Sequence, residues 1–399
     1  MHRTIAALAC LLPFVNSHAG EETRCPDCDS PAVITAEAAY TAEMWRQVSG
    51  ASVGNRYLDN IDFTLAVDGA AFGAERLQLF GALLYNNGRE LAGMSGAMQG
   101  VSNIETTEGV RVFEWWAQWT TAADDGSLRF GLYDLNSEFD AIDTAGLFIN
   151  PSHGIGPDFA QSGAGGPSIF PVTALALRAQ KSMGAWSMQA AVLDGEPQDG
   201  EYFDRDRFAI SNRQGALLVG ELNYRSEAGT RIGGGYWQYT AGFDDLTAVD
   251  AAGDPLRRHD NAGAYLILES PTLLADGSDR GLNLFLRTGV AASRINAVGR
   301  YHGAGAVYSG MFFPERQDQF GFAIAVAQAG RPWRSLEQTM GATPSHAEYN
   351  YEVTYRIGLV ERLALQFDVQ RVVNPGMSST VDSAWVVGLR LVATQAWSR

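Results

Sequence analysis

The chain has 399 residues, of which 46% are hydrophobic, 19% are charged, 44 are glycine and 14 are proline. This length and composition fit one large domain or two ordinary ones and exclude a disordered or collagen-like chain. The formal charge of −16, from 45 acidic and 29 basic residues, excludes a protein that binds nucleic acid through its phosphates.

The N-terminus predicts export. Residues 1–19 combine a weakly positive start, an apolar stretch at Ile5–Val15 and a small-x-small cleavage site at Ser17–Ala19, which is typical of a secretory signal peptide. The apolar stretch is the longest in the chain and is shorter than the roughly 20 residues of a spanning helix. A polytopic α-helical membrane protein is therefore excluded.

Residues 20–36 form a polar segment that contains Cys25 and Cys28. In an exported chain, a C-x-x-C pair most often closes a small local disulfide. A redox-catalytic pair would instead lie at the start of a helix that follows a strand, and the segment shows neither pattern. We expect a disulfide between these two cysteines.

From residue 37 onward, apolar and polar residues alternate with a period of two, which predicts β-strands. In residues 347–357 one face is apolar or aromatic and the other is polar. The first face carries Ala347, Tyr349, Tyr351, Val353, Tyr355 and Ile357, and the second carries Glu348, Asn350, Glu352, Thr354 and Arg356. Sixteen segments of this kind are predicted, at residues 37–48, 57–68, 75–85, 110–120, 127–136, 171–180, 185–194, 215–225, 230–240, 263–269, 281–289, 302–311, 319–329, 346–357, 362–372 and 384–393.

The connections between these segments alternate in length. The short ones are residues 69–74, 121–126, 181–184, 226–229 and 358–361, and the long ones are residues 86–109, 137–170, 195–214, 241–262 and 330–345. Short periplasmic turns, long extracellular loops and an even number of antiparallel strands are typical of transmembrane β-barrels. We expect residues 37–399 to form one outer-membrane barrel of about 16 strands.

A secreted β-sandwich or propeller also has alternating strands, but its apolar faces point into a closed core. The positions of the aromatic residues favour the barrel, because tyrosine and tryptophan form girdles at the two membrane interfaces. Such residues lie near strand ends or on the apolar face, at Tyr57, Tyr85, Trp115, Trp119, Trp186, Tyr236, Tyr355 and Trp385.

Several segments resemble the carbohydrate-selective porin family of Gram-negative outer membranes (OprB-type). They are Tyr57-Leu-Asp-Asn-Ile-Asp62, Gln99-Gly-Val-Ser-Asn-Ile-Glu105, Phe113-Glu-Trp-Trp116, Gly131-Leu-Tyr-Asp-Leu-Asn-Ser-Glu-Phe-Asp140, Gly146-Leu-Phe-Ile-Asn-Pro-Ser152, Gly166-Pro-Ser-Ile-Phe-Pro171, Val192-Leu-Asp-Gly195 and Asp368-Val-Gln-Arg-Val-Val-Asn-Pro-Gly376. The resemblance implies a barrel that passes neutral sugars, glucose among them, by passive diffusion.

A channel for neutral sugars needs paired charged donors and acceptors, together with aromatic planes for the C–H face of the sugar. Strand phase places such side chains on the lumen side, and the long connection 137–170 is expected to fold into the barrel and narrow it, with a surface-exposed loop as the alternative. The predicted substrate-binding residues are Glu114, Trp116, Arg129, Tyr133, Glu138, Asp140, Arg178, Glu221, Arg287 and Arg356.

Two other functions stay open at this point. One is a secreted glycan hydrolase that uses Glu138 with Asp140 or Asp143 as acid and base, and the other is a plugged barrel with a structural or adhesive role. Residues 134–143 alternate like a calcium loop, but Phe139 occupies the position where an EF-hand has glycine, so only a calcium site of another kind stays open there. We expect no metal and no cofactor. The sequence leaves the preferred sugar and the choice between monomer and homotrimer open.

Overall fold

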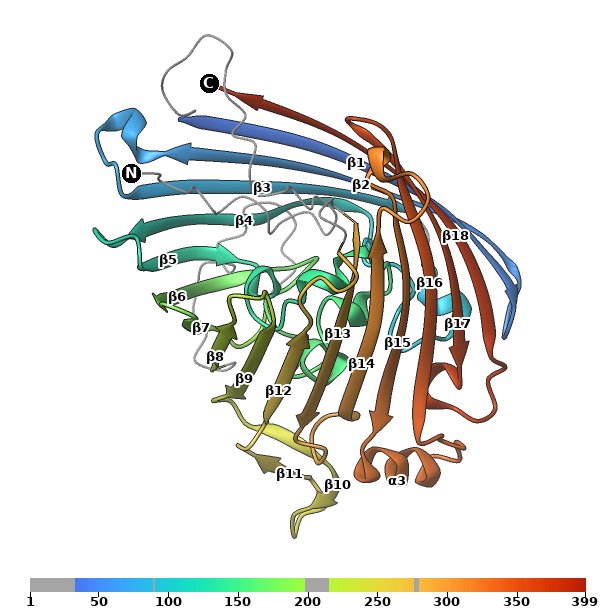
Figure 1. The fold of residues 1–399 in the computed structure, drawn as a ribbon. Helices are drawn as coiled ribbons and strands as arrows, with labels where there is room; N and C mark the ends of the chain where they lie inside the picture. The colour runs from blue at the N-terminus through green and yellow to red at the C-terminus, as the bar shows by residue number, and fades with distance from the viewer. Residues whose placement is uncertain (1–32, 89, 198–214, 276–279) are drawn as a thin grey trace.

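The computed structural model describes residues 33–88, 90–197, 215–275 and 280–399 (Figure 1). The predicted signal peptide (1–19) and the Cys25–Cys28 pair lie outside the described residues, so both stay predictions.

Sixteen antiparallel strands of the described chain close into a barrel. They are β1 (Ile34–Ser49), β2 (Gly54–Asp68), β3 (Leu77–Gly88), β4 (Gly109–Thr120), β5 (Gly126–Tyr133), β6 (Ala174–Met183), β7 (Trp186–Asp194), β8 (Ala216–Arg225), β9 (Arg231–Tyr239), β12 (Ala262–Glu269), β13 (Gly281–Ala291), β14 (Val298–Ser309), β15 (Gln319–Ala329), β16 (Ala347–Val360), β17 (Leu363–Val373) and β18 (Ala384–Ser398). Each strand pairs with its neighbours in this order, and β18 pairs with β1 to close the sheet. The predicted barrel of about 16 strands is confirmed.

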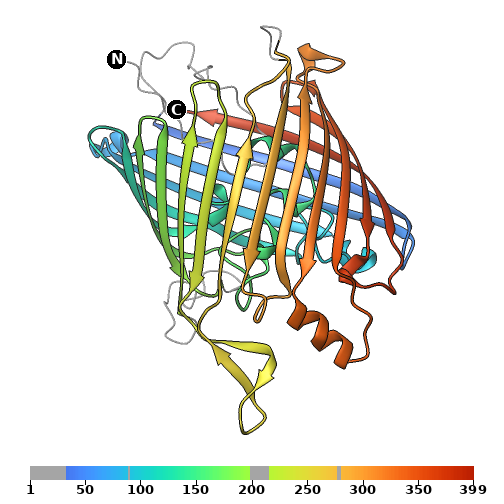
Figure 2. The same cartoon turned by 60° about the horizontal axis from the view of Figure 1, so that its bottom comes forward.

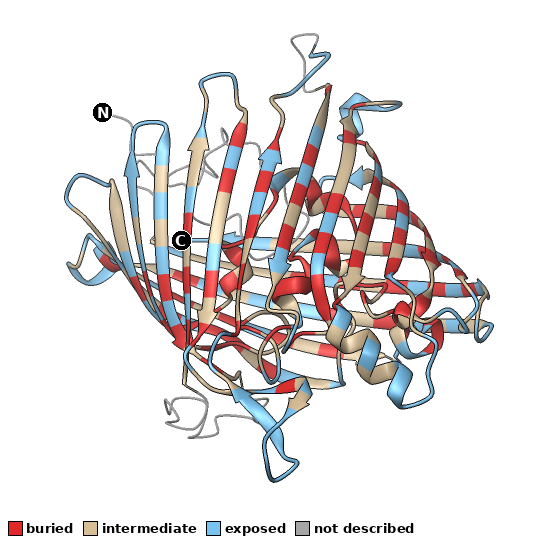
Figure 3. Ribbon diagram, turned by 90° about the horizontal axis from the view of Figure 1, so that it is seen from below, coloured by how far each residue is buried: buried red, intermediate tan, exposed pale blue. Residues whose placement is uncertain are grey.

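Successive side chains of each strand point to opposite sides of the wall. Buried and exposed residues accordingly alternate along the strands (Figure 3). On β18 the outward residues Trp385, Val387 and Leu389 are exposed, whereas the inward residues Val386 and Arg390 are buried. The same phase runs through the barrel, where charged residues are buried inside and large apolar residues are exposed outside. A soluble β-sandwich would show the reverse, so that alternative is wrong.

The two ends of the barrel differ in the length of their connections. One end carries turns such as residues 184–185 and 361–362, the start of β1 and the end of β18. The other carries the long connections 89–108, 134–173 and 330–346. Because periplasmic turns are short in transmembrane barrels, we assign the first end to the periplasm and the second to the extracellular side.

A small hairpin and a few short helices complete the described structure. The hairpin, β10 (Phe243–Val249) and β11 (Pro255–Arg258), and helix α3 (Arg331–Thr339) project from the extracellular end (Figure 2). The remaining helices are α1 (Ala92–Ser95), α2 (Pro157–Ala160) and 3₁₀ helices at Gly69–Phe72, Leu135–Ser137, Asp143–Leu147, Pro151–His153, Pro314–Arg316 and Pro375–Met377. None of the helices in the described ranges is long and apolar enough to cross a membrane.

Candidate functional site

The long connection 134–173 folds into the lumen, as Figures 1 and 2 show. Its apolar side chains pack against the inward residues of one side of the wall, where Phe159 stacks on Trp237 with ring centroids 4.9 Å apart. Phe148 similarly lies 5.9 Å from Phe285. Burying these aromatic rings holds the connection against β9 and β13, because each fully buried ring contributes about 1.5–3 kcal/mol.

Glutamates of the barrel wall fix the path of this connection by accepting hydrogen bonds from its backbone. The Asp140 N–H donates to Glu221 Oε2 at 2.9 Å, and the Thr144 N–H donates to Glu269 Oε1 at 2.7 Å. Further along, Glu352 accepts from two successive N–H groups, those of Ile149 and Asn150. Glu114 accepts from the Asp134 N–H at 2.8 Å. These buried carboxylates therefore anchor the loop.

Arg287 on β13 clamps the middle of the same connection. Its Nε and Nη2 donate to the two carboxylate oxygens of Asp140, at 3.0 and 2.6 Å, and its Nη1 donates to Asp158. All three side chains are buried. Gly156 makes room for this arrangement, because a Cβ there would lie 2.2 Å from the Arg287 Cζ. Arg287 therefore acts on the loop rather than on open lumen.

The second long connection, residues 89–108, is held inside by the same chemistry. The Met98 and Gln99 N–H groups each donate to Glu348 at 2.8 Å. Ser102 donates to Glu43, which also accepts from Arg390 at 2.5 Å. The two connections touch one another, because the N–H of Asn103 donates to the carbonyl of Ile149. The two connections therefore form one joined structure inside the barrel.

A polar cluster with an aromatic stack lies where the first connection meets β4, β5 and β6. Glu138 accepts from Tyr133 at 2.5 Å and pairs with Arg178 at 2.7 Å and with Arg129 at 3.4 Å. The Arg129 guanidinium lies 3.9 Å from the ring of Trp116. The side chain of Glu138 keeps 17% of its surface exposed and that of Arg129 keeps 9%.

Neighbouring groups complete this cluster. Gln118 Oε1 accepts from Arg129 at 2.9 Å and from Arg178 at 2.9 Å, so it holds both guanidinium groups side by side. Phe80 stacks on Trp116, with the centroids of the two rings 4.8 Å apart. The cluster thus brings two guanidinium groups, a carboxylate and two stacked aromatic rings together at one place on the wall.

Comparison with known proteins identifies the family. The model of the carbohydrate-selective porin, OprB family, matches residues 53–394. The chain belongs to the carbohydrate-selective porin family. Porin B of Pseudomonas aeruginosa is 26% identical over 249 residues, which cover 56% of this chain and 55% of that relative, so the match spans about half the length of the relative.

Solved structures agree on the fold of this porin. The high-pH structure of Pseudomonas putida OprB has a TM-score of 0.80 and 20% identity, covering 91% of this chain and 94% of that one. The low-pH structure of the same protein has a TM-score of 0.58 and 16% identity, covering 91% and 92%. The porin family places the chain in the outer membrane, and its members are channels rather than enzymes.

The porin fold brings eight of the ten predicted site residues into two groups and leaves Glu114 and Arg356 outside both. Trp116, Arg129, Tyr133, Glu138 and Arg178 form the polar cluster. Asp140, Glu221 and Arg287 form the clamp, and Glu114 anchors the start of the loop. Arg356 stands alone on the lumen face of β16, partly exposed and with no side-chain partner among the described residues.

Sequence reasoning missed Gln118 and Phe80. Both lie in predicted strands, and strand phase places Gln118 on the same side as Trp116, two residues away. That signal could have found Gln118. Phe80 is found only from the pairing of β3 with β4, which puts it directly opposite Trp116.

The carboxylates proposed for a glycan hydrolase are held apart by different partners. Glu138 pairs with Arg178, Asp140 with Arg287 and Asp143 with Arg225. Among the described residues, no group of three or more His, Cys, Asp or Glu side chains could hold a metal ion.

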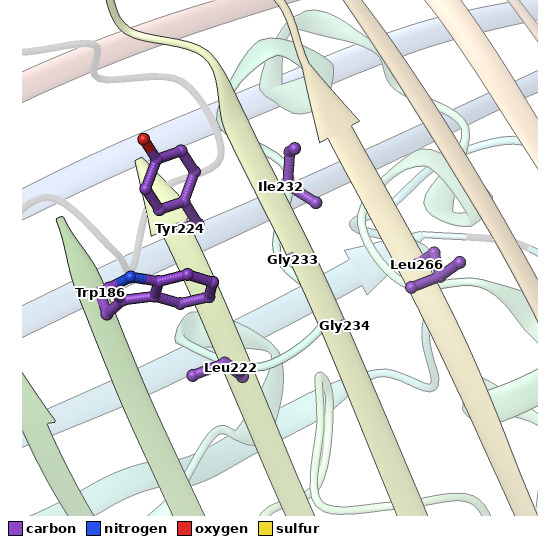
Figure 4. A pocket seen from close by; sticks show the side chains of 7 residues that line it. All are labelled: Trp186, Leu222, Tyr224, Ile232, Gly233, Gly234 and Leu266. Atoms are coloured by element: carbon purple, nitrogen blue, oxygen red, sulfur yellow. The ribbon is translucent and has the colours of Figure 1, made fainter. Parts of the chain in front are cut away.

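One surface groove lies on the outside of the barrel. Figure 4 shows it between β7, β8, β9 and β12, lined by outward side chains that include Trp186, Leu222, Ile232 and Leu266. Glycines of β9 form its floor. This groove faces away from the lumen.

Proposed function

We propose that this porin passes neutral carbohydrates, monosaccharides such as glucose among them, by passive diffusion through the lumen that connections 89–108 and 134–173 narrow. The observation that carries the proposal is the polar cluster around Glu138, where two guanidinium groups and a carboxylate lie beside stacked aromatic rings. A sugar hydroxyl is both donor and acceptor, so it can bind at such a place in several orientations. Contacts of this kind are weak enough for release.

The cluster also favours neutral solutes over cations. Glu138 pairs with both Arg129 and Arg178 and compensates one of their two positive charges, so a passing cation gains little from displacing a partner. A hydroxyl group, in contrast, adds a hydrogen bond to a charged group without disrupting the ion pairs, at about 1.5–3 kcal/mol for a charge-assisted bond. Arg356, further toward the periplasm on β16, offers a second contact on the way out.

Planar-bilayer recording with added glucose tests the proposal. The porin should give a steady conductance that glucose reduces, and Arg129→Gln and Glu138→Gln should each weaken this block roughly three- to tenfold while current persists. Arg371→Gln is the matched control, because it removes the same charge from an outward side chain over Trp385. Equal block in the cluster variants and the control would contradict the site, and absence of conductance would indicate a plugged barrel.

A further inference from the structure

The outward face of the barrel carries basic residues toward one end. Arg46 on β1, Arg300 and His302 on β14, and Arg371 on β17 point away from the lumen near the extracellular ends of their strands. At the periplasmic end the outward-facing Lys181 is neutralised by Asp125 at 2.5 Å. Among the strand residues that the structure describes, the outward-facing basic side chains without an acidic partner therefore lie toward the extracellular side.

Arg300 and His302 form the most open part of this set. The residue between them, Tyr301, is buried and donates to the carbonyl of Ser152 inside the lumen, which fixes its two neighbours on the outside. Arg300 is exposed and has no hydrogen bond or ion pair within the part of the chain that the structure describes. His302 is also exposed: its Nδ1 is hydrogen-bonded to Thr288 Oγ1 at 2.9 Å, and its Nε2 has no hydrogen bond to another described residue.

Other polar groups extend the surface toward the extracellular end. Gln328 on β15 lies opposite Arg300 in the strand register and faces outward with it. Three residues further, Arg331 begins helix α3 and is exposed. The hydrogen bond from the Gly330 N–H to the Ala297 carbonyl keeps the start of this helix beside β14. Arg300, His302, Gln328 and Arg331 are called the rim patch below.

Toward the centre of the membrane, the rim patch continues into an apolar strip. The outward residues of β14 below His302 are Ala304 and Ala306, which are small. They lie between Leu284 and Leu286 on β13 and Phe322 on β15, all three exposed. The strip is thus shallow and bordered by large apolar side chains, a shape that an acyl chain fills.

We propose that the rim patch binds the phosphate groups of lipopolysaccharide, the phosphorylated glycolipid of the outer leaflet. A guanidinium group binds phosphate through two parallel hydrogen bonds, and Arg300 has all of its donors available. The patch lies on the lipid-facing wall, on the side of the membrane where this lipid resides, and the alanine strip below it receives an acyl chain. The site is separate from the lumen and adds lipid binding to the porin function.

Native mass spectrometry of the whole chain in mild detergent, with purified lipopolysaccharide added, tests this site. Unchanged protein should bind one lipopolysaccharide molecule. The double variant Arg300→Gln with His302→Gln should bind at least about tenfold more weakly, because it loses charge-assisted hydrogen bonds. Lipopolysaccharide whose phosphates have been removed enzymatically should bind as weakly to the unchanged protein, and added salt should reduce the binding.

Lys181→Gln is the matched control, since it removes an outward positive charge at the opposite rim, and it should bind lipopolysaccharide normally. Heat-dependent mobility in detergent gels confirms that each variant is a folded barrel. Equal binding by the double variant, or equal binding of the dephosphorylated lipid, would overturn the proposal. A change in the number of chains per particle in the double variant would overturn it as well, because the rim patch would then contact a second copy of the chain.

Discussion

Arg287 is the single residue on which the position of the inward-folded connection depends most. It satisfies two buried carboxylates from different parts of that connection, Asp140 and Asp158. Removing one member of a buried ionic group leaves the others uncompensated, at a cost of about 3–5 kcal/mol. We therefore expect Arg287→Met to lower the free energy of unfolding by this amount, measured by urea unfolding in lipid vesicles. The freed connection should also give larger and noisier single-channel currents.

A matched ion pair at the surface provides the control. Arg225 pairs with Asp143 of the same connection at 3.0 Å, but both side chains are more than half exposed. Arg225→Met should therefore change stability by less than about 1 kcal/mol. Adding Asp140→Asn and Asp158→Asn to Arg287→Met should restore much of the lost stability, because no charge is then left unpaired. Equal losses for Arg225→Met and Arg287→Met would refute the clamp.

At the scale of an element, the hairpin of β10 and β11 depends on one carboxylate. Asp245 accepts hydrogen bonds from the N–H groups of Thr247 and Ala248 and from Arg258. Burial opposes its ionisation, but these three partners hold the pKa of Asp245 well below its usual range. Because the pKa is lower in the hairpin than in an unfolded chain, the ionised group stabilises the hairpin above about pH 4.

This stabilisation should be lost as the pH falls toward the depressed pKa of Asp245. Hydrogen exchange of the Thr247 and Ala248 amides, corrected for its intrinsic pH dependence, is expected to show strong protection at pH 7. Asp245→Asn should reduce that protection at pH 7, whereas Asp244→Asn, which removes an exposed partner of Arg257, should leave it unchanged. Protection that is the same in both variants would show that the carboxylate does not hold the turn.

The strands could be predicted from the sequence because apolar and polar residues alternate along them. The predicted segments 346–357 and 362–372 correspond to β16 and β17 within three residues at each end, since their polar and apolar faces are distinct. The hairpin of β10 and β11 was not predicted. Its turn is held by Asp245, and such side-chain bonds to the backbone leave no period in the sequence.

For the lumen, the sequence predicted which side chains point inward. Strand phase placed Trp116, Arg129 and Arg178 together on the lumen side, and the structure joins them through Glu138 and Gln118. The anchoring role of the wall glutamates was not predictable. Their partners are backbone N–H groups of the inward connections, which every residue except proline has, so no sequence signal marks them.

For the whole molecule, the difference in connection length between the two ends of the barrel predicts how the barrel is oriented in the membrane. Ala185 lies in the two-residue turn between β6 and β7 and is exposed, and Ala251 lies at the exposed tip of the hairpin of β10 and β11. In a background with Cys25 and Cys28 replaced by serine, we expect Ala251→Cys to react in intact cells with a maleimide attached to a polymer of about 5 kDa, roughly fifteen times the mass of a disaccharide. Ala185→Cys should react only after the outer membrane is broken.

The polymer is the deciding feature of this experiment, because a reagent as small as a sugar would pass through the channel and label both ends. An orientation with long loops outside follows from the way barrel hairpins cross the membrane, short turns remaining on the side of entry. It also puts Arg300 and His302 at the level of the outer leaflet and Lys181 at the inner one. Labelling of Ala185→Cys in intact cells would show that the barrel has the opposite orientation in the membrane. The rim patch would then face phospholipid instead of lipopolysaccharide.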